Sequence, residues 1–323
     1  MSKLLWIKRN TMKRRPFGKT GLSVTPLCIG TSALGSPPQY GYEVSAERAV
    51  ATMCRVFEGP ISFIDTSNEY GNGGDSERRI GQALAKVGGL PKDFVLGTKV
   101  DPVLGSSDFS GERVRASVAE SLERLGLSRL QLVYLHDPER ITFAEGIAPG
   151  GALEALVQLR KEGLVDHLGV AGASIDLLRR YLATEVFEAV ISHNRYTLVD
   201  QSAEPLLSDA LQRGVAFVNA APYGGGMLVK GPDIVPKYCY EPVSAATLDR
   251  VRKMQQLCAS YDVPLAAAAL QFSLRESRIT STIVGISEPE RVEQTLRLAE
   301  WPIPDKLWDE LEPLVVVGKN GIL

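Results

Sequence analysis

Residues 94–136 read FVLGTKVDPVLGSSDFSGERVRASVAESLERLGLSRLQLVYLH, in which two short apolar runs flank a longer amphipathic segment. In the middle segment apolar residues recur at steps of four and three, the spacing of a helix with one buried face, at Val114, Val118, Leu122 and Leu125. Each flanking run is short and apolar, which is typical of a buried strand. The stretch therefore predicts a βαβ unit, in which a helix connects two parallel strands.

The same alternation continues on both sides of this unit, from about residue 27 to residue 300. We predict strands over residues 27–30, 62–65, 94–98, 130–136, 165–170, 189–193, 216–219 and 282–284, with amphipathic segments between them. Eight strand–helix pairs fit a closed barrel better than an open doubly wound sheet, which usually has about five or six strands. The predicted fold class is therefore α/β, a single-domain (β/α)8 TIM barrel.

Some segments fall outside this alternation. Residues 1–14 are rich in Lys and Arg and predict a disordered N-terminal extension, which leaves residues 15–323 for the barrel domain. Residues 17–22 (FGKTGL) predict a hairpin turn. Residues 224–242, rich in Gly, Pro and Tyr, predict a long irregular connection that acts as a lid at the C-terminal face.

The composition excludes several classes of protein. With 44% hydrophobic and 23% charged residues, the chain is expected to be globular with a sizeable core, and neither disordered nor fibrous. Its formal net charge of −2 provides no field that would attract nucleic acid or an anionic membrane as a whole. We therefore expect a small-molecule substrate as partner, with no nucleic acid and no membrane. A monomer and a small homo-oligomer both fit this pattern.

The sequence also bears on location and on metals. No apolar run approaches the roughly 20 residues that span a bilayer, which predicts a cytoplasmic protein. The cysteines lie far apart, without a paired Cys motif or a neighbouring His cluster, at Cys28, Cys54, Cys239 and Cys258. We interpret them as reduced structural thiols and predict no metal site.

Polar side chains follow three consecutive predicted strands. Asp65 ends the second strand, Lys99 follows the third and His136 ends the fourth. Tyr70 lies in the loop after the second strand. Taken alone, each residue has an ordinary explanation, as a turn former, a solvent-reaching Lys, a core His or a packing Tyr. Because the active site of such a barrel lies at the C-terminal ends of its strands, a single site explains all of them together.

The chemistry of these side chains is that of proton transfer. A phenol with a pKa near 10 is a poor proton relay at neutral pH. The ammonium of Lys99 would favour the phenolate of Tyr70, and the carboxylate of Asp65 would hold that ammonium in place. His136 would then hydrogen-bond the substrate oxygen. We therefore predict Asp65, Tyr70, Lys99 and His136 as the catalytic residues.

The sequence around these residues resembles the aldo-keto reductase family. The resemblance lies in FIDTSNEYG (63–71), SE (76–77), IGQAL (80–84), GTK (97–99), LVYLHD (132–137), GALEALVQLRKEG (151–163) and SEPERV (287–292). It covers nearly the whole chain from Arg15 onward and places the family's Asp, Tyr, Lys and His tetrad on the same four residues. The family-like stretch begins directly after Met12, so residues 1–11 are also open to interpretation as an upstream extension absent from the native protein.

The resemblance implies an oxidoreductase that binds an extended NAD or NADP across the barrel mouth, without a Rossmann domain. The absence of a G-x-G-x-x-G fingerprint therefore does not count against it. The implied cofactor contacts are Gly30, Thr31, Ser32, Asp65, His193, Pro222, Tyr223, Gly224, Gly225, Gly285, Ser287, Arg291 and Gln294. The glycines that follow Tyr223 suit close approach of the backbone to phosphate, although a glycine cluster is also typical of a flexible loop.

Several positions depart from the family pattern. Ala171 and Gly172 replace a Ser-Asn pair that commonly holds the carboxamide, and Ala220 replaces an aromatic that stacks on the nicotinamide. Gly285 stands where NADP-preferring members often have a Lys, whereas Arg291 is retained. Because the loss of one of two cations weakens binding of the 2′-phosphate, NAD is favoured over NADP.

Within the family, NRYTLVD (194–200) and NAAPYGGGML (219–228) resemble the branch with D-threo-aldose, L-fucose and L-galactose dehydrogenases and pyridoxal 4-dehydrogenase. The branch implies oxidation of an aldose of one of these types at C1 to a lactone, with Tyr70 as the proton acceptor. Other interpretations stay open: a pyridoxal 4-dehydrogenase, an NADPH-dependent reductase of broad aldehyde and ketone specificity, a cofactor-sensing binding subunit, or a structural barrel without cofactor.

Overall fold

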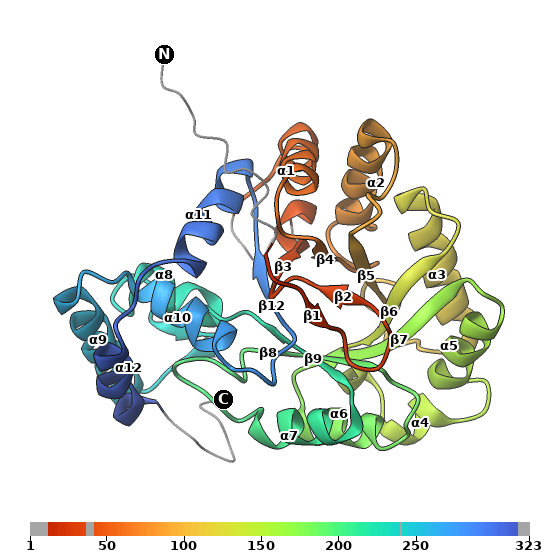
Figure 1. Ribbon diagram of the computed structural model, residues 1–323. Helices are drawn as coiled ribbons and strands as arrows, with labels where there is room; N and C mark the ends of the chain where they lie inside the picture. Colours follow the sequence, from red (N-terminus) through yellow and green to blue (C-terminus); the bar gives the residue numbers. More distant parts are fainter. Residues whose placement is uncertain (1–11, 37–41, 240, 316–323) are drawn as a thin grey trace.

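The computed structural model describes residues 12–36, 42–239 and 241–315, which form a closed barrel of parallel strands surrounded by helices (Figure 1). The barrel strands are β3 (Leu27–Gly30), β4 (Phe63–Asp65), β5 (Val95–Val100), β6 (Leu130–His136), β7 (Val165–Gly172), β8 (Ala189–His193), β9 (Ala216–Ala220) and β12 (Ser281–Gly285). They pair in this order, and β12 closes the ring between β9 and β3. The predicted (β/α)8 barrel is confirmed, and each predicted strand begins and ends within two residues of an observed one.

Helices cover the outside of the barrel between successive strands. They are α1 (Ala46–Glu58), α2 (Asp75–Val87), α3 (Gly111–Leu125), α5 (Ala152–Lys161), α6 (Ile175–Leu182), α7 (Glu204–Arg213), α10 (Leu265–Leu274) and α11 (Pro289–Ala299), with α4 (Phe143–Ile147), α8 (Met227–Lys230), α9 (Ala245–Ser260) and α12 (Asp305–Leu311) in addition. Short 3-10 turns are η1 (Ser32–Gly35), η3 (Pro138–Arg140), η4 (Gly224–Gly226) and η5 (Glu312–Leu314). In α3 the hydroxyl of Ser110 caps the N-terminus by accepting from the Arg113 N–H, and Gly126, with φ of +67°, ends the helix.

A small antiparallel hairpin closes the N-terminal end of the barrel. It consists of β1 (Arg15–Pro16) and β2 (Ser23–Val24). Phe17 at its turn is fully buried, and its ring meets the ring of Phe63 edge to face with 5.4 Å between centroids. The predicted hairpin is confirmed. Because an aromatic side chain seals this end, the opposite, C-terminal end of the barrel is left for a site.

The connection after β9 is more ordered than the sequence pattern predicts. Besides η4 and α8 it contains a short ladder between β10 (Lys237–Tyr238) and β11 (Glu241–Pro242). Tyr238 is fully buried, and its hydroxyl donates to the main-chain oxygen of Asn194 at 2.6 Å. Met227 is buried in an apolar cluster with residues of α9 and α10. The predicted long connection is present, and a few buried side chains anchor it without any periodic spacing. Its action as a lid stays a prediction.

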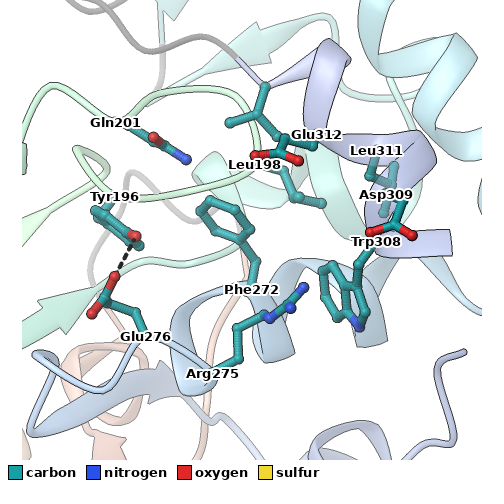
Figure 2. Close-up of a pocket in the computed structure, with 11 residues that line it drawn as sticks. Tyr196, Leu198, Gln201, Phe272, Arg275, Glu276, Trp308, Asp309, Leu311 and Glu312 are labelled. Atoms are coloured by element: carbon teal, nitrogen blue, oxygen red, sulfur yellow. Dashed lines mark hydrogen bonds between the residues drawn. The ribbon is translucent and has the colours of Figure 1, made fainter. Parts of the chain in front are cut away.

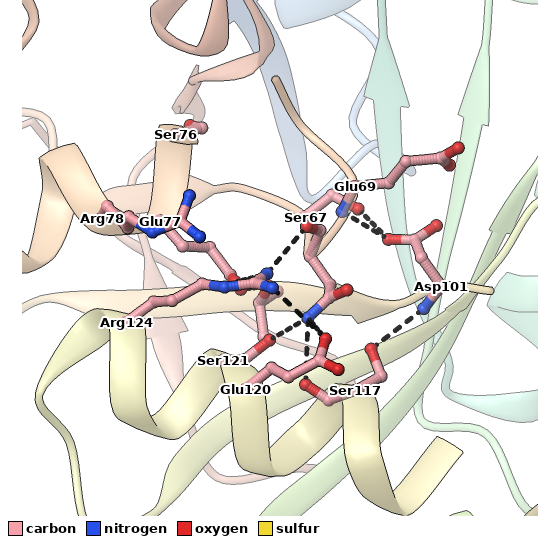
Figure 3. Close-up of polar contacts among 12 residues, drawn as sticks. Ser67, Glu69, Ser76, Glu77, Arg78, Asp101, Ser117, Glu120, Ser121 and Arg124 are labelled. Carbon is pink, nitrogen blue, oxygen red and sulfur yellow. Dashed lines mark hydrogen bonds and ion pairs between the residues drawn. The ribbon is translucent and has the colours of Figure 1, made fainter. Parts of the chain in front are cut away.

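A network of charged side chains ties α2 and α3 to the outside of the barrel (Figure 3). Glu77 on α2 is completely buried and accepts from the hydroxyl of Thr98 at 2.6 Å. Arg124 on α3 pairs with Glu77 at 3.3 Å and donates to the main-chain oxygen of Asn68 at 3.0 Å. Because Asn68 belongs to the loop after β4, this network supports that loop from behind.

The predicted disordered extension over residues 1–14 falls largely outside the described residues. Within the described residues, Arg14 donates to the hydroxyl of Ser62 at 2.6 Å.

In the described part of the chain no single helix is long and apolar enough to cross a membrane. The helices α9 and α10 pass that test of length and composition only as a pair, which is bent by 99°.

A small cavity of about 340 Å³ lies outside the barrel, where α10 and α12 meet the segment after β8. Figure 2 shows the hydroxyl of Tyr196 pointing toward the carboxylate of Glu276, and the two lie 3.2 Å apart. The guanidinium of Arg275 lies 4.3 Å from the centre of the Trp308 ring. None of the predicted site residues lines this cavity, so the chemistry has to be sought at the barrel mouth.

Candidate active site

The C-terminal ends of three neighbouring strands bring predicted catalytic side chains together. Asp65 is the last residue of β4, Lys99 is the last but one of β5, and His136 is the last of β6. Tyr70 reaches the same place from the loop after β4. Because the barrel strands are parallel, all these ends open on one face, and side chains far apart in the sequence converge there.

Lys99 links Asp65 to Tyr70. Its Nζ donates to Asp65 Oδ2 at 2.7 Å, to the main-chain oxygen of Thr66 at 2.7 Å and to the hydroxyl oxygen of Tyr70 at 3.0 Å. Burial alone would lower the pKa of Lys99, but the charges at Asp65 and Tyr70 outweigh it and raise that pKa above its usual range. The ammonium is therefore a fixed positive charge beside the Tyr70 oxygen.

The backbone next to Tyr70 is held by a close approach of two glycines. Gly71 has φ of +86°, and a Cβ built there would lie 2.7 Å from the Cα of Gly35. Gly35 ends η1, so the loop after β4 packs directly on the turn after β3. Since only glycine fits both the positive φ and this contact, the two turns fix the position of Tyr70.

His136 contacts a buried carboxylate that the sequence pattern did not indicate. Asp101 Oδ1 lies 2.6 Å from His136 Nδ1, and the Asp101 side chain is fully buried. The rings of His136 and Tyr70 meet edge to face with 5.9 Å between centroids. Burial alone would lower the pKa of His136, but the carboxylates of Asp101 and Asp137 outweigh it and raise that pKa. The available signal was an acidic residue two positions after Lys99, where β5 has just ended.

The tetrad opens into a cavity of about 820 Å³ at the barrel mouth. Exposed Leu104 and half-exposed Tyr42 form an apolar lip. On the wall Arg140 donates to Glu69 at 2.7 Å. Glu69 also brings a carboxylate oxygen near Asp101 and His136, within 4.8 Å. Because these atoms are already engaged in hydrogen bonds and an ion pair, we interpret the cluster as a polar network beside the cavity and not as a set of metal ligands.

The predicted cofactor contacts divide into two groups. Those that line the cavity are Gly30, Ser32, Asp65, His193 and Gly285. Thr31 lies buried behind it, where its hydroxyl donates to the main-chain oxygen of Asp65 at 3.0 Å. The remaining predicted contacts, in the loop after β9 and around the start of α11, lie outside the cavity lining.

Two polar groups of the cavity wall fit a nicotinamide nucleotide. Asp65 Oδ1 is buried and has no hydrogen-bond partner within the described residues, so it offers an acceptor to a hydroxyl or amide donor. His193 accepts at Nδ1 from the Asn194 amide, 3.1 Å away, which leaves Nε2–H as a donor. Burial lowers the pKa of His193 and keeps its ring neutral. The site thus offers both an acceptor and a donor to the ribose and carboxamide of such a cofactor.

One of the glycines after β9 has a packing role. Gly224 has φ of +55°, and a Cβ there would collide with the ring of Tyr238. Tyr223 is partly buried, and its buried hydroxyl has no hydrogen-bond partner within the described residues. The identity of Gly224 is therefore explained by the anchored Tyr238, and the phosphate contact expected for Pro222 and Gly225 stays a prediction.

Acidic and basic side chains are paired around the start of α11. Arg291 lies 3.3 Å from Glu288 and donates to the side-chain oxygen of Gln294 at 2.7 Å. Glu288 also pairs with Arg48 at 3.2 Å. A Cβ built on Gly285 would meet nothing within 4 Å, so this end of the cavity is open. The predicted 2′-phosphate partner Arg291 is thus already engaged by a carboxylate.

Known proteins resemble this chain over nearly its whole length. The family model described as "Aldo/keto reductase family" matches residues 26–315. The D-threo-aldose 1-dehydrogenase of a Pseudomonas species is 31% identical over 90% of this chain and 94% of its own length. The pyridoxal 4-dehydrogenase of Microbacterium luteolum is 30% identical over 93% and 96%. The L-galactose dehydrogenase of Arabidopsis thaliana is 32% identical over 95% of each chain.

The fold also resembles solved structures. An aldo-keto reductase from Bacillus halodurans, in its holo form, superposes with a TM-score of 0.79 at 24% identity, covering 95% of this chain and 97% of that one. This likeness concerns the fold.

Proposed function

This chain belongs to the aldo/keto reductase family of NAD(P)-dependent oxidoreductases, and we propose that it oxidises C1 of an aldose to a lactone with NAD as the hydride acceptor. The observation that carries the proposal is the contact between the buried ammonium of Lys99 and the oxygen of Tyr70, at the mouth of a large cavity. Two relatives above 30% identity, named for D-threo-aldose and L-galactose, support a sugar of one of these types. The L-fucose type stays a candidate from the branch resemblance.

In the proposed reaction Tyr70 accepts the proton of the C1 hydroxyl. The ammonium of Lys99 favours the phenolate that takes this proton, and Asp65 keeps the ammonium charged and in place. His136 hydrogen-bonds the same substrate oxygen. A bound nicotinamide cofactor supplies the hydride acceptor for the carbon. In the reverse direction the same Tyr70 returns the proton to a carbonyl oxygen.

The cavity wall supports a polyhydroxylated substrate. Glu69 and Arg140 present a carboxylate and a guanidinium side by side, so they offer acceptors and donors to several hydroxyl groups. Tyr42 and Leu104 offer an apolar surface to the carbon face of a sugar ring. That apolar lip also suits a flat aromatic ring. We therefore keep pyridoxal, the substrate named for the relative from Microbacterium luteolum, as the second candidate.

The charges around α11 support NAD as the cofactor. Glu288 would repel a 2′-phosphate, whereas a free 2′-hydroxyl can donate to a carboxylate. Arg291 is held by Glu288, and Gly285 contributes no cation. The proposal further includes a cytoplasmic location and a monomeric or small homo-oligomeric state, both of which stay predictions.

A panel of substrates and cofactors tests the proposed function. Turnover of L-galactose, L-fucose, D-arabinose, pyridoxal and a simple aldehyde is measured with NAD, NADP, NADH and NADPH. We expect oxidation of at least one of the sugars with NAD, with lactone as the product. Activity confined to NADPH and aldehydes would instead establish a broad carbonyl reductase. Cofactor binding without turnover of any substrate would favour a binding subunit, and no thermal stabilisation by either nucleotide would favour a structural barrel.

A further inference from the structure

Asp101 lies behind His136 and not in the cavity. Its Oδ1 contacts His136 Nδ1 at 2.6 Å, and its Oδ2 accepts from the hydroxyl of Ser67 and from the Glu69 N–H, the latter at 3.1 Å. The backbone N–H of Asp101 donates to Ser117 Oγ on α3 at 3.1 Å. Figure 3 shows Glu69 and Ser117 on opposite sides of Asp101. The carboxylate is therefore held from several elements.

These contacts determine which atoms of His136 carry hydrogen. Burial tends to raise the pKa of Asp101, but His136 and Ser67 outweigh it and lower that pKa, so Asp101 is a carboxylate with no hydrogen to donate. The short contact to His136 then requires a hydrogen on Nδ1. Nε2 is left for the cavity, which His136 lines.

We propose that Asp101 is a positioning residue, whose carboxylate holds the Nδ1–H of His136 so that Nε2 is presented to the substrate oxygen beside Tyr70. The inference rests on the proposed function, because Asp101 acts on the reaction through His136. Without this acceptor the ring loses its fixed tautomer and orientation. A small loss of alignment at the reacting oxygen is costly, because proton transfer and hydrogen bonding need near-ideal geometry.

Other charged groups also face His136. Asp65 and Tyr70 approach from the side of β4, Lys99 from β5, and His193 from β8. Asp137 follows His136 directly, and its Oδ1 lies 3.8 Å from Nε2. Lys99 disfavours a charged imidazole, whereas Asp137 favours it. Asp101 differs from these groups because it bonds to Nδ1 directly, so its replacement changes both the tautomer and the charge of the ring.

The first test measures the protonation of the two ring nitrogens of His136 directly. The chain has three histidines, so the ring signals of ¹⁵N-histidine-labelled protein can be assigned with His136→Gln. In the wild type we expect Nδ1 to carry hydrogen on both sides of the titration. Asp101→Asn should lower the ratio of imidazolium to imidazole at a given pH by about tenfold, equivalent to about one pH unit. Asp108→Asn makes the same substitution at an exposed site in the same loop and should leave these signals unchanged.

This measurement uses neither substrate nor cofactor, so its outcome is independent of the proposed function. A wild-type spectrum in which Nδ1 lacks hydrogen, or an Asp101→Asn spectrum identical to the wild type, would show that Asp101 does not position the ring. If Asp101→Asn fails to fold, the wild-type spectrum still decides the tautomer. Ser67→Ala then serves as the second variant, since it leaves the carboxylate of Asp101 in place while it removes a donor to Asp101 and an oxygen 3.2 Å from His136 Nδ1.

The second test measures kcat, with the sugar that the wild type oxidises best in the panel above. Asp101→Asn should lower kcat about 10- to 100-fold with NAD affinity unchanged, and Ser67→Ala should lower it less. In a His136→Gln background the further effect of Asp101→Asn should be less than about threefold, because the two residues act as one unit. Equal losses in both backgrounds would mean that Asp101 has only a structural role. A wild type inactive on the whole panel would count against the proposed function. The measurement on the His136 ring would still test the role of Asp101.

Discussion

The Nζ of Lys99 lies 3.0 Å from the hydroxyl oxygen of Tyr70 and 4.5 Å from the centre of the Tyr70 ring. One buried ammonium therefore contacts the oxygen that we propose as the proton acceptor, while its other contacts hold it to Asp65 and to the backbone. The residues come from different βα units, so the relationship depends on the closed barrel.

Replacement of Tyr70 by Phe should abolish proton transfer while sparing cofactor binding. The change removes one oxygen and keeps the ring, so packing against His136 is retained. We expect kcat to fall about 10²- to 10⁴-fold, the usual contribution of a general acid or base. Steady-state kinetics and a fluorescence titration with NAD check this. Unchanged oxidation of every wild-type substrate would exclude Tyr70 as the proton acceptor.

Replacement of Lys99 by Met should destabilise the fold as well as the site. The variant leaves Asp65 as a buried carboxylate without its partner, which costs about 3–5 kcal/mol of unfolding free energy. The double variant with Asp65→Asn should recover most of that loss, because no charge then stays buried. Urea unfolding measures both. Arg115→Met, which breaks an exposed pair with Glu162, is the control and should cost far less, because solvent screens that pair.

The stability of the protein should carry a pH dependence from His136. Its folded-state pKa is raised above the usual value of 6.5, so protonation favours the folded state. The contribution is fully present below about pH 6.5 and is lost as the pH rises through the folded-state pKa. The Tm difference between wild type and His136→Gln should therefore shrink from about pH 6 to about pH 9. A difference that grows over this range would contradict the assignment.

Cofactor preference should respond to the charge at the start of α11. Glu288→Gln removes the carboxylate that engages Arg291, and the freed guanidinium can then pair with a 2′-phosphate. We expect kcat/KM with NADP to rise about tenfold relative to NAD, since a hydrogen bond to a charged group contributes about 1.5–3 kcal/mol. Glu300→Gln at the other end of α11 should leave the ratio unchanged. An unaltered ratio in Glu288→Gln would place the 2′ position elsewhere.

The contact between Gly71 and Gly35 should matter for both stability and activity. Gly71→Ala forces a side chain into a positive φ and into the backbone of Gly35. Gly88 has nearly the same φ, +84° against +86°, but a Cβ there meets nothing within 4 Å. Gly88→Ala should therefore cost only the backbone strain, about 1–2 kcal/mol, and Gly71→Ala clearly more. Thermal unfolding and kcat together check this, and equal losses would mean that the two turns can separate.

Much of the fold could be predicted because parallel barrel strands are buried on both faces and therefore appear as short apolar runs. The helices between them carry their own periodicity and caps, as Ser110 and Gly126 do for α3. The structure of the residues after β9 could not be predicted in this way. These residues are anchored by Tyr238, whose hydroxyl donates to the main-chain oxygen of Asn194, 44 positions earlier in the chain. No local sequence pattern predicts such a contact.

The sequence by itself determined the eight βα units and the place of Asp65, Lys99 and His136 at strand ends, because periodicity and strand ends are local properties. Only the tertiary structure decided that Asp101 would hold His136, that Glu288 would engage Arg291 and that Gly35 would touch Gly71. The first and third pairs lie on different βα units, 35 and 36 positions apart in the chain. Glu288 and Arg291 are only three positions apart, and their contact depends on the direction of the two side chains. Barrel closure and side-chain packing set the distances within these pairs. Neither can be predicted from the spacing of residues along the chain.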